Sequence, residues 1–162
     1  MKLCLDSLDT PIGHIWLVGD ERALRSLDFD ADPDALAARH APYALEPRPG
    51  FGGFRERLSS YFGGDLQALD DIPTSPAGTA FQLRVWQALR TIPAGATISY
   101  LELAARVGRP TASRAVGAAN GRNPIALVAP CHRVIGSNGG LTGYAGGLER
   151  KRWLLRHEGR LI

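Results

Sequence analysis

The sequence predicts an α+β fold, in which a small N-terminal sheet with one or two helices precedes a mainly helical C-terminal domain that contains a helix-turn-helix. Three observations carry this prediction. Strand-like alternation is confined to the first 29 residues, whereas apolar residues after residue 80 recur at helical spacing. A stretch punctuated by proline and glycine, residues 70–78, separates the two patterns. We therefore expect two domains, at residues 1–76 and 77–162.

The N-terminal half opens with three predicted strands, over Lys2–Leu8, Gly13–Val18 and Ala23–Phe29. Asp32 as an N-cap and Pro33 at the first helical position then predict a short helix that ends near His40. Aromatic residues at helical spacing predict a second helix over Phe51–Phe62, and the glycine pair that follows it ends this helix.

The C-terminal half begins with a capping-box pattern, Thr79 with Gln82, which opens a helix that ends before Pro93. Two short helices are expected next, over Ser99–Val107 and from Thr111 to Asn120, and the Gly108–Pro110 turn between them indicates a helix-turn-helix. The apolar run Ile125–Ala129 predicts a buried strand, and Glu149–His157 predicts a closing helix.

Charge divides unevenly between the halves. Residues 1–76 carry 7 Lys and Arg against 13 Asp and Glu, a net charge of −6, whereas residues 77–162 carry 12 against 3, a net charge of +9. Nearly all the basic residues are arginine, whose forked guanidinium suits phosphates and base edges. The second half is therefore expected to bind a polyanion, with the acidic half in a supporting role.

Apolar runs are short throughout the sequence. None approaches the roughly 20 residues that span a bilayer, and the N-terminal segment lacks the pattern of a secretory signal. We therefore expect a soluble, cytoplasmic protein without a membrane partner. No feature indicates oligomerisation, so a monomer is expected.

The two cysteines differ in their surroundings. Cys4 lies in an alternating strand segment and is interpreted as a small buried hydrophobic residue. A disulfide between Cys4 and Cys131 is possible, but thiols in an intracellular protein usually stay reduced. Cys131 stands in the run Pro130-Cys131-His132-Arg133-Val134, where neighbouring cationic groups lower the pKa of a thiol.

A nucleophilic cysteine needs a base. His132 is a candidate, acting through a water because side chains adjacent in sequence do not readily face each other. A carboxylate on the far side of the imidazole would fix its tautomer. Glu158, at the end of the closing helix, is the candidate for that carboxylate, one of only three acidic residues after residue 76.

Several separated motifs in the C-terminal half resemble those of the O6-alkylguanine-DNA alkyltransferases. The resemblance extends from about Phe81 to Gly159, and its motifs are the Pro130–Ile135 run, Ile98–Tyr100, Ser113–Gly117, Asn123-Pro124, Leu141–Gly147 and Trp153–Gly159. The N-terminal half matches weakly, through Asp9–Gly13.

This resemblance implies suicidal DNA repair by direct reversal. Cys131 would accept the alkyl group of O6-alkylguanine, and also of O4-alkylthymine, in double-stranded DNA, once per molecule. His132 would remove its proton, Glu158 would orient His132, and Asn123 would support the turn around the cysteine. Because O6 is buried in the duplex, the nucleotide must first leave the base stack.

The resemblance also implies contacts to the substrate. Tyr100 would help rotate the nucleotide, and Arg114 would enter the stack in its place. Tyr144 would lie against the alkyl group, the Ala145 N–H would face O6, and the carbonyls of Cys131 and Val134 would receive the guanine amine. Three further residues of the second helix of the helix-turn-helix are expected to contact DNA, namely Ser113, Ala115 and Gly117.

No cofactor is expected. Some members of the family hold a structural zinc in the N-terminal domain, but residues 1–76 offer only Cys4, His14 and His40 as soft ligands. These are too few for a closed four-ligand site, so no metal is expected.

Two other classes remain open. One is a non-catalytic helix-turn-helix protein that binds alkylated DNA and in which Cys131 belongs only to the core. The other is a thiol hydrolase that pairs Cys131 with a remote histidine, His157 or His14, and turns over repeatedly.

Overall fold

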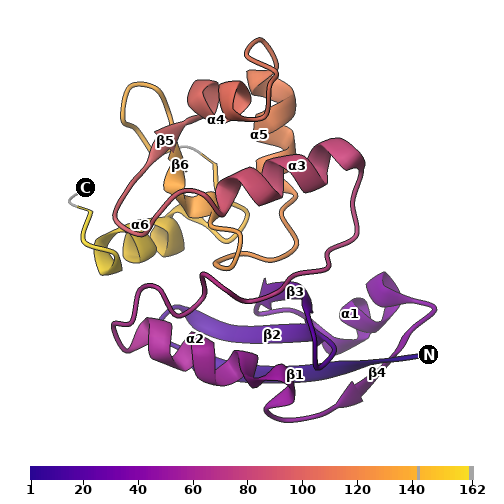
Figure 1. Ribbon diagram of the computed structural model, residues 1–162. Coiled ribbons are helices and arrows are strands. Elements are labelled where there is room, and N and C mark those ends of the chain that lie inside the picture. The colour runs from indigo at the N-terminus through magenta and orange to yellow at the C-terminus, as the bar shows by residue number, and fades with distance from the viewer. Residues whose placement is uncertain (142, 161–162) are drawn as a thin grey trace. The chain divides into compact units, whose positions relative to one another are not determined.

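The computed structural model describes residues 1–141 and 143–160, and its contacts divide the chain into two compact units, Met1–Pro76 and Ala77–Ile162. The first unit is a four-stranded sheet with two α-helices, and the second unit is mainly helical (Figure 1). The predicted α+β fold is thus confirmed. Within the described residues, no helix is long and apolar enough to cross a membrane.

The sheet of the first unit has the strand order β3-β2-β1-β4. Its strands are β1 (Lys2–Thr10), β2 (Gly13–Gly19), β3 (Leu24–Phe29) and β4 (Ala44–Pro47). The first three form an antiparallel meander, as the alternation predicts, and β4 adds to β1 in parallel. The sequence did not predict β4, because this short edge strand is mostly exposed and ends in a proline.

Burial along β1 differs from a simple alternation of leucines. The buried residues are Leu3 and Asp6, while Cys4 is half-buried. The Asp6 carboxylate accepts hydrogen bonds from the backbone N–H groups of Ser7 and Gly50, both at 2.8 Å, and from Arg55 at 3.1 Å. A buried carboxylate is tolerated here because these donors replace water.

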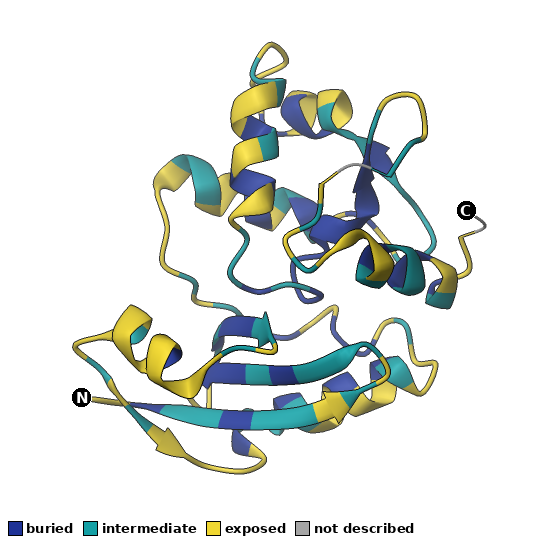
Figure 2. Ribbon diagram, turned by 180° about the vertical axis from the view of Figure 1, so that it is seen from behind, coloured by how far each residue is buried: buried dark blue, intermediate teal, exposed yellow. Residues whose placement is uncertain are grey.

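Two helices complete the first unit. Helix α1 (Pro33–His40) begins after the predicted N-cap Asp32, whose side chain accepts the Asp34 N–H. Helix α2 (Phe54–Phe62) starts later than predicted, because Gly52 and Gly53 adopt left-handed φ values of 61° and 72° that break the helical path. A single 3₁₀ turn, η1 (Phe51–Gly53), precedes it. Buried residues of α2 and of the sheet form the core of this unit (Figure 2).

The second unit contains four α-helices within its described residues: α3 (Ala80–Leu89), α4 (Tyr100–Arg106), α5 (Ser113–Gly121) and α6 (Leu148–His157). The capping box of Thr79 and Gln82 opens α3 as predicted. Helices α4 and α5 pack together as the two helices of the helix-turn-helix. Helix α5 starts at Ser113 rather than Thr111, because the Ala112 N–H bonds to the Arg109 carbonyl and extends the turn. The Trp86 indole of α3 donates to the Ala119 carbonyl at 2.8 Å, which fixes the end of α5.

The expected strand at Ile125–Ala129 is wrong. The segment is a series of tight turns, in which buried Leu127 adopts a left-handed φ of 73°. Hydrogen bonds from Val128 to Ala126 and from Ala129 to Ile125 hold this strained conformation. The apolar run is buried, as its composition indicates, but its backbone turns instead of extending.

We expect Asp6→Ala to destabilise the protein by about 2 kcal/mol, because it leaves two backbone N–H groups and Arg55 without their buried acceptor. Urea denaturation measures the free energy of unfolding. Asp9→Ala is the matched control in the same strand: Asp9 is exposed and pairs with His14, so its loss is expected to cost less than about 1 kcal/mol. Equal losses for both variants would refute the structural role of Asp6.

Candidate active site

Cys131 opens a 3₁₀ turn, η2 (Cys131–Arg133), between the tight turns described above and strand β6 (Val134–Ile135). Its side chain belongs to the core, with only 7% of the residue exposed. Cys131 is a free thiol, as is Cys4. The backbone before it is sharply bent, since the Cys131 N–H donates to the Ala129 carbonyl at 2.8 Å.

Asn123 braces this bend from within. Its Nδ2 donates to the Ala129 carbonyl at 2.7 Å, and its Oδ1 accepts the Ile125 N–H at 3.1 Å. The same side chain acts to lower the pKa of the Cys131 thiol. One amide therefore ties the start of the turn segment to its end.

His132, Arg133 and Glu158 form a buried network. His132 Nε2 lies 2.9 Å from Glu158 Oε2. Arg133 donates to the same carboxylate twice, from Nε to Oε1 and from Nη2 to Oε2, each at 2.9 Å. Its Nη1 donates to the Ile92 carbonyl at 2.6 Å. All three side chains are buried, so removing one partner of this fork would leave an uncompensated charge in the core.

The network decides the protonation of His132. Burial alone would raise the pKa of Glu158, but the contacts with His132 and Arg133 outweigh it and hold that pKa well below its usual range. Burial lowers the pKa of His132, helped by the charges of Arg133 and Lys151 and opposed by Glu158. His132 is therefore neutral at pH 7. Because an ionised carboxylate only accepts, Nε2 carries the proton and Nδ1 keeps its lone pair.

The Cys131 thiol is protonated at rest. Burial raises its pKa, and this outweighs the opposing effects of the Asn123 amide, the Lys151 charge and nearby backbone N–H groups. Neighbouring cations were expected to lower this pKa; the Lys151 charge does act in that direction, but burial is the larger effect. A base is therefore required to form the thiolate.

Lys151 of α6 is fully buried beside this site. Its Nζ donates to the Val134 carbonyl at 2.7 Å, and burial lowers its pKa to about 8, against the opposing effect of Cys131. The sequence analysis assigned it no role, because it stands in a charged run that reads as solvated surface. Its spacing from the buried Leu154, Leu155 and Glu158 places all four residues on one face of the helix. This shared face was the signal in the sequence that could have predicted the burial of Lys151.

Tyr100 is brought to the site by a two-stranded parallel sheet. Strand β5 (Ile98–Ser99) pairs with β6, with Ile98 opposite Val134, and Tyr100 follows directly as the first residue of α4. The Tyr100 ring also lies against α5, where a Cβ at Gly117 would stand 3.7 Å from it. The half-buried tyrosine thus lies between α5 and the segment that carries Cys131.

The remaining predicted contacts divide by burial. Arg114 and Ala115 are exposed on the first turn of α5, and Ser113 and Gly117 are half-exposed. Val134 is buried, Tyr144 is half-buried and Ala145 is exposed. Thr142, part of the glycine-rich motif, lies outside the described residues. The two carbonyls predicted to receive the guanine amine already accept side-chain donors, since Asn120 Nδ2 lies 3.5 Å from the Cys131 oxygen and Lys151 bonds that of Val134.

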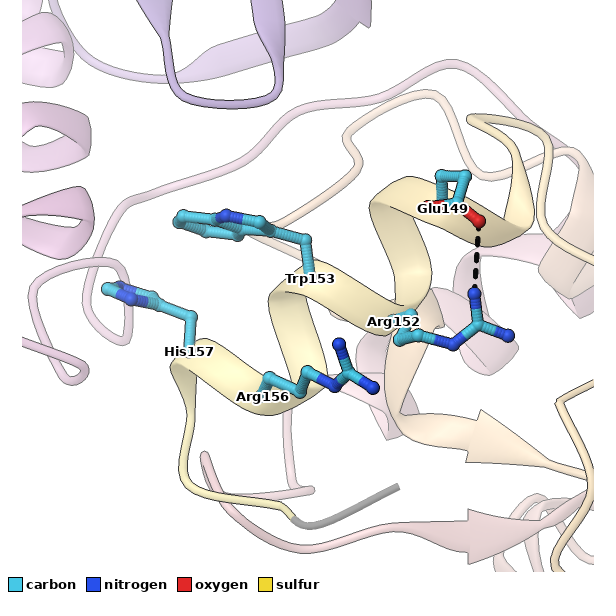
Figure 3. A pocket seen from close by; sticks show the side chains of 5 residues that line it. All are labelled: Glu149, Arg152, Trp153, Arg156 and His157. Carbon is cyan, nitrogen blue, oxygen red and sulfur yellow. Dashed lines mark hydrogen bonds and ion pairs between the residues drawn. The ribbon is translucent and has the colours of Figure 1, made fainter.

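A different face of α6 carries a pocket of about 410 Å³. The residues that line it are Glu149, Arg152, Trp153, Arg156 and His157. Figure 3 shows Trp153 and His157 projecting to the same side of the helix, where their rings stack 4.8 Å apart. The histidine whose ring nitrogen bonds the buried Glu158 carboxylate is His132. Among the described residues, no group of three or more His, Cys, Asp or Glu side chains could hold a metal ion.

Fold and site together define a helix-turn-helix protein with a buried thiol beside a histidine–glutamate–arginine network. Family models agree: 6-O-methylguanine DNA methyltransferase, ribonuclease-like domain, matches residues 5–76, and 6-O-methylguanine DNA methyltransferase, DNA binding domain, matches residues 80–160. The chain belongs to the 6-O-methylguanine DNA methyltransferase family.

Individual relatives are similar along their whole length. The chain is 48% identical to the methylated-DNA--protein-cysteine methyltransferase of Salmonella typhimurium, covering 100% of this chain and 99% of the relative. It is also 48% identical to the protein of that name from Mycolicibacterium paratuberculosis, covering 95% and 91%. A crystal structure of the Mycobacterium tuberculosis homologue in complex with DNA has a TM-score of 0.82 at 44% identity and covers 96% of this chain and 92% of that one.

We expect Glu158→Gln to lower the free energy of unfolding by about 3 kcal/mol at pH 7, because it leaves the Arg133 charge buried without its partner. The Glu158 pKa is depressed in the folded protein, so its contribution is present above the ordinary glutamate pKa of about 4.3 and is lost as pH falls below it. The difference between wild type and variant should therefore shrink in acid.

Urea denaturation at a series of pH values measures this difference. Glu149→Gln is the control on the same helix, because Glu149 is exposed and forms a surface ion pair with Arg152. It should change stability by less than about 1 kcal/mol. A penalty for Glu158→Gln that stayed constant from neutral to acid pH would contradict the charge argument.

Proposed function

We propose that the protein repairs alkylated DNA by transferring the alkyl group from O6 of guanine to Cys131, once per molecule. The observation that carries the proposal is the buried Cys131 next to His132 in the chain. His132 is bonded through Nε2 to Glu158, and Arg133 donates to the same carboxylate. Family membership and the similarity to a homologue solved with DNA support it. Activity on O4-alkylthymine is part of the same proposal.

The two units would have different tasks. The basic second unit, residues 77–162, would bind double-stranded DNA through α4 and α5 and accept the alkyl group. The acidic first unit, residues 1–76, would support it. The arginines on the second unit suit the phosphates of the duplex, and the exposed first turn of α5 suits its groove.

Activation begins with neutral His132. Nδ1 would accept the Cys131 proton through a water, and the resulting imidazolium would be stabilised by the Glu158 carboxylate against Nε2. Lys151 and the Asn123 amide would then stabilise the thiolate. The Arg133 fork keeps Glu158 ionised, so the carboxylate can stabilise charge without accepting the proton itself.

Substrate access requires base flipping, because O6 lies inside the duplex. Arg114 would fill the gap left by the nucleotide, and Tyr100 would meet the base at the mouth of the site. The hydroxyl of Tyr100 and the N–H of Ala145 would stabilise charge that develops on the departing guanine. Tyr144 would lie against the alkyl group.

Transfer is a displacement at carbon, in which the sulfur–carbon bond forms as the bond from O6 to carbon breaks. The product is a thioether, which offers no leaving group that water readily displaces. The thiol is therefore not regenerated, and the protein is consumed. We further propose a cytoplasmic location as a monomer, since both cysteines are free thiols and a cytosolic protein keeps them so.

Neither alternative is favoured. In a purely structural role, the Cys131 thiol would have only apolar surroundings, whereas the Asn123 amide and the Lys151 charge both act on its pKa. For a thiol hydrolase with a remote histidine, His157 would have to reach the thiol, whereas it stacks on Trp153 in the pocket on another face of α6.

The proposal is tested by intact mass after incubation with a duplex that contains one O6-methylguanine. Wild type should gain one methyl group, mapped to Cys131 and saturating at one per chain. Cys131→Ala should bind the duplex and gain none, while the control Cys4→Ala should behave as wild type. Tight binding without mass gain in wild type would support a lesion-binding protein, and demethylation beyond one equivalent would indicate a turnover enzyme.

The role of Arg114 is tested by comparing two substrates. Arg114→Ala should slow transfer from duplex DNA by about 10- to 100-fold, because extrusion of the base costs a few kcal/mol. Transfer from free O6-alkylguanine needs no extrusion and should change little. Arg122→Ala, an exposed arginine at the other end of α5, is the control and should slow duplex repair much less. Equal losses on both substrates for Arg114→Ala would refute the proposal that Arg114 fills the gap left by the flipped nucleotide.

A further inference from the structure

Asn120 lies in the last turn of α5, at the opposite end of the helix from Arg114. It is a buried polar residue, with 5% of its surface exposed. Its Nδ2 lies 3.5 Å from the carbonyl oxygen of Cys131, within reach of a hydrogen bond. Its Oδ1 is buried and has no hydrogen-bond partner among the described residues. A buried acceptor without a donor is costly, so this atom calls for an explanation.

The orientation of this amide follows from its neighbour. Turning it over would bring Oδ1, an acceptor, against the Cys131 carbonyl oxygen, a second acceptor, and the two would repel. The nitrogen therefore faces the carbonyl. Oδ1 is left as an acceptor beside the residue that carries the thiol.

His132, the residue that follows Cys131 in the chain, carries a second buried acceptor. His132 Nδ1 also has no hydrogen-bond partner among the described residues, and its lone pair is available because Nε2 carries the proton. Asn120 and His132 both adjoin Cys131, one through a hydrogen bond to its carbonyl and the other through the peptide chain. The Cys131 thiol supplies only one hydrogen, so it cannot satisfy both acceptors.

A single water in contact with all three groups would satisfy them. It would donate one hydrogen to His132 Nδ1 and the other to Asn120 Oδ1, and it would accept the S–H of Cys131. Buried waters with about three hydrogen bonds to otherwise unpaired polar groups are a regular part of protein interiors. With only His132 to hold it, the same water would be free to rotate away from the thiol.

We propose that Asn120 is a positioning residue that anchors the proton relay between Cys131 and His132; the inference rests on the proposed function. The S–H bond breaks as the water oxygen takes the proton, and the water releases its other proton to Nδ1. The products are a thiolate, an imidazolium and an intact water that still donates to Asn120 Oδ1. Protons and charge balance without a further reactant.

The neutral amide suits this role. The charged groups around the thiol are Lys151 of α6, whose charge favours the thiolate, and the Arg133–Glu158 pair behind His132. A carboxylate at residue 120 would oppose ionisation of the thiol, whereas an amide orients the water without adding charge. Asn120 also belongs to the helix that carries Arg114, so the relay is anchored on the proposed DNA-reading element.

The test uses the full chain and free O6-benzylguanine, which removes the need for DNA binding. Asn120→Leu keeps the approximate size of the side chain and removes its polar atoms. We expect its transfer rate at pH 7 to fall about tenfold, the effect of losing one well-placed hydrogen bond. The loss should shrink toward alkaline pH, where hydroxide forms the thiolate directly. Titration followed by ultraviolet absorbance should show the same pKa for the Cys131 thiol in Asn120→Leu as in wild type, since the substitution removes no charge.

Val116→Ala is the matched control. Val116 is fully buried in the same helix and carries no polar atom, so its truncation weakens packing of α5 without touching the relay. It should lower thermal stability and reduce the rate by a factor that does not depend on pH. Asn120→Ala, which favours a helix, provides the same pH comparison should the leucine variant fold poorly.

Two outcomes would overturn the inference: an Asn120 variant with an unchanged rate, or one whose loss is the same at every pH, as in Val116→Ala. Either leaves the proposed function intact as long as wild type gains one benzyl group at Cys131. A wild type that gains no alkyl group at Cys131 would instead refute the proposed function.

Discussion

The buried carboxylate of Glu158 is the charge around which the site is built. It stands at the C-terminal end of α6, where the helix dipole disfavours an anion, and it is cut off from water. It is retained there because Arg133 grips both its oxygens and His132 donates to one of them. Since Arg133 also holds the Ile92 carbonyl after α3, one ion pair joins the end of α6, the turn that carries Cys131 and the chain beyond α3.

The burial that excludes water from the network also keeps the Cys131 thiol protonated and unreactive at rest. A cysteine with a raised pKa is a poor nucleophile toward the many electrophiles and oxidants of a cell. Because such a protein can use its thiol only once, a thiolate present at rest would be lost to reactions with other electrophiles. In the mechanism we propose, the His132 relay would form the thiolate where substrate is bound, and Lys151 would stabilise it there.

Local signals in the sequence predicted the elements whose ends are fixed by neighbours in the chain. Asp32 and Pro33 predicted the start of α1, and the Thr79–Gln82 box predicted the start of α3. The catalytic candidates came from a family resemblance and the spacing of motifs. The features that sequence reasoning missed depend on distant contacts. Lys151 is buried because α6 packs against η2, and its Nζ reaches the Val134 carbonyl. The Ile125–Ala129 segment turns because the Asn123 side chain and local backbone hydrogen bonds hold it.

The Trp86–Ala119 hydrogen bond has a further consequence for how such proteins diverge. It pins one end of α5 to α3, next to Asn120, while the other end, with Ser113 and Ala115, faces outward. Natural variation at the outward end can alter sequence preference on DNA, or the grip on it, without disturbing the chemistry. If Asn120 has the role proposed above, substitutions at the pinned end would change how readily the thiol ionises. One end of α5 can therefore vary in sequence during evolution, whereas the sequence of the other end is constrained.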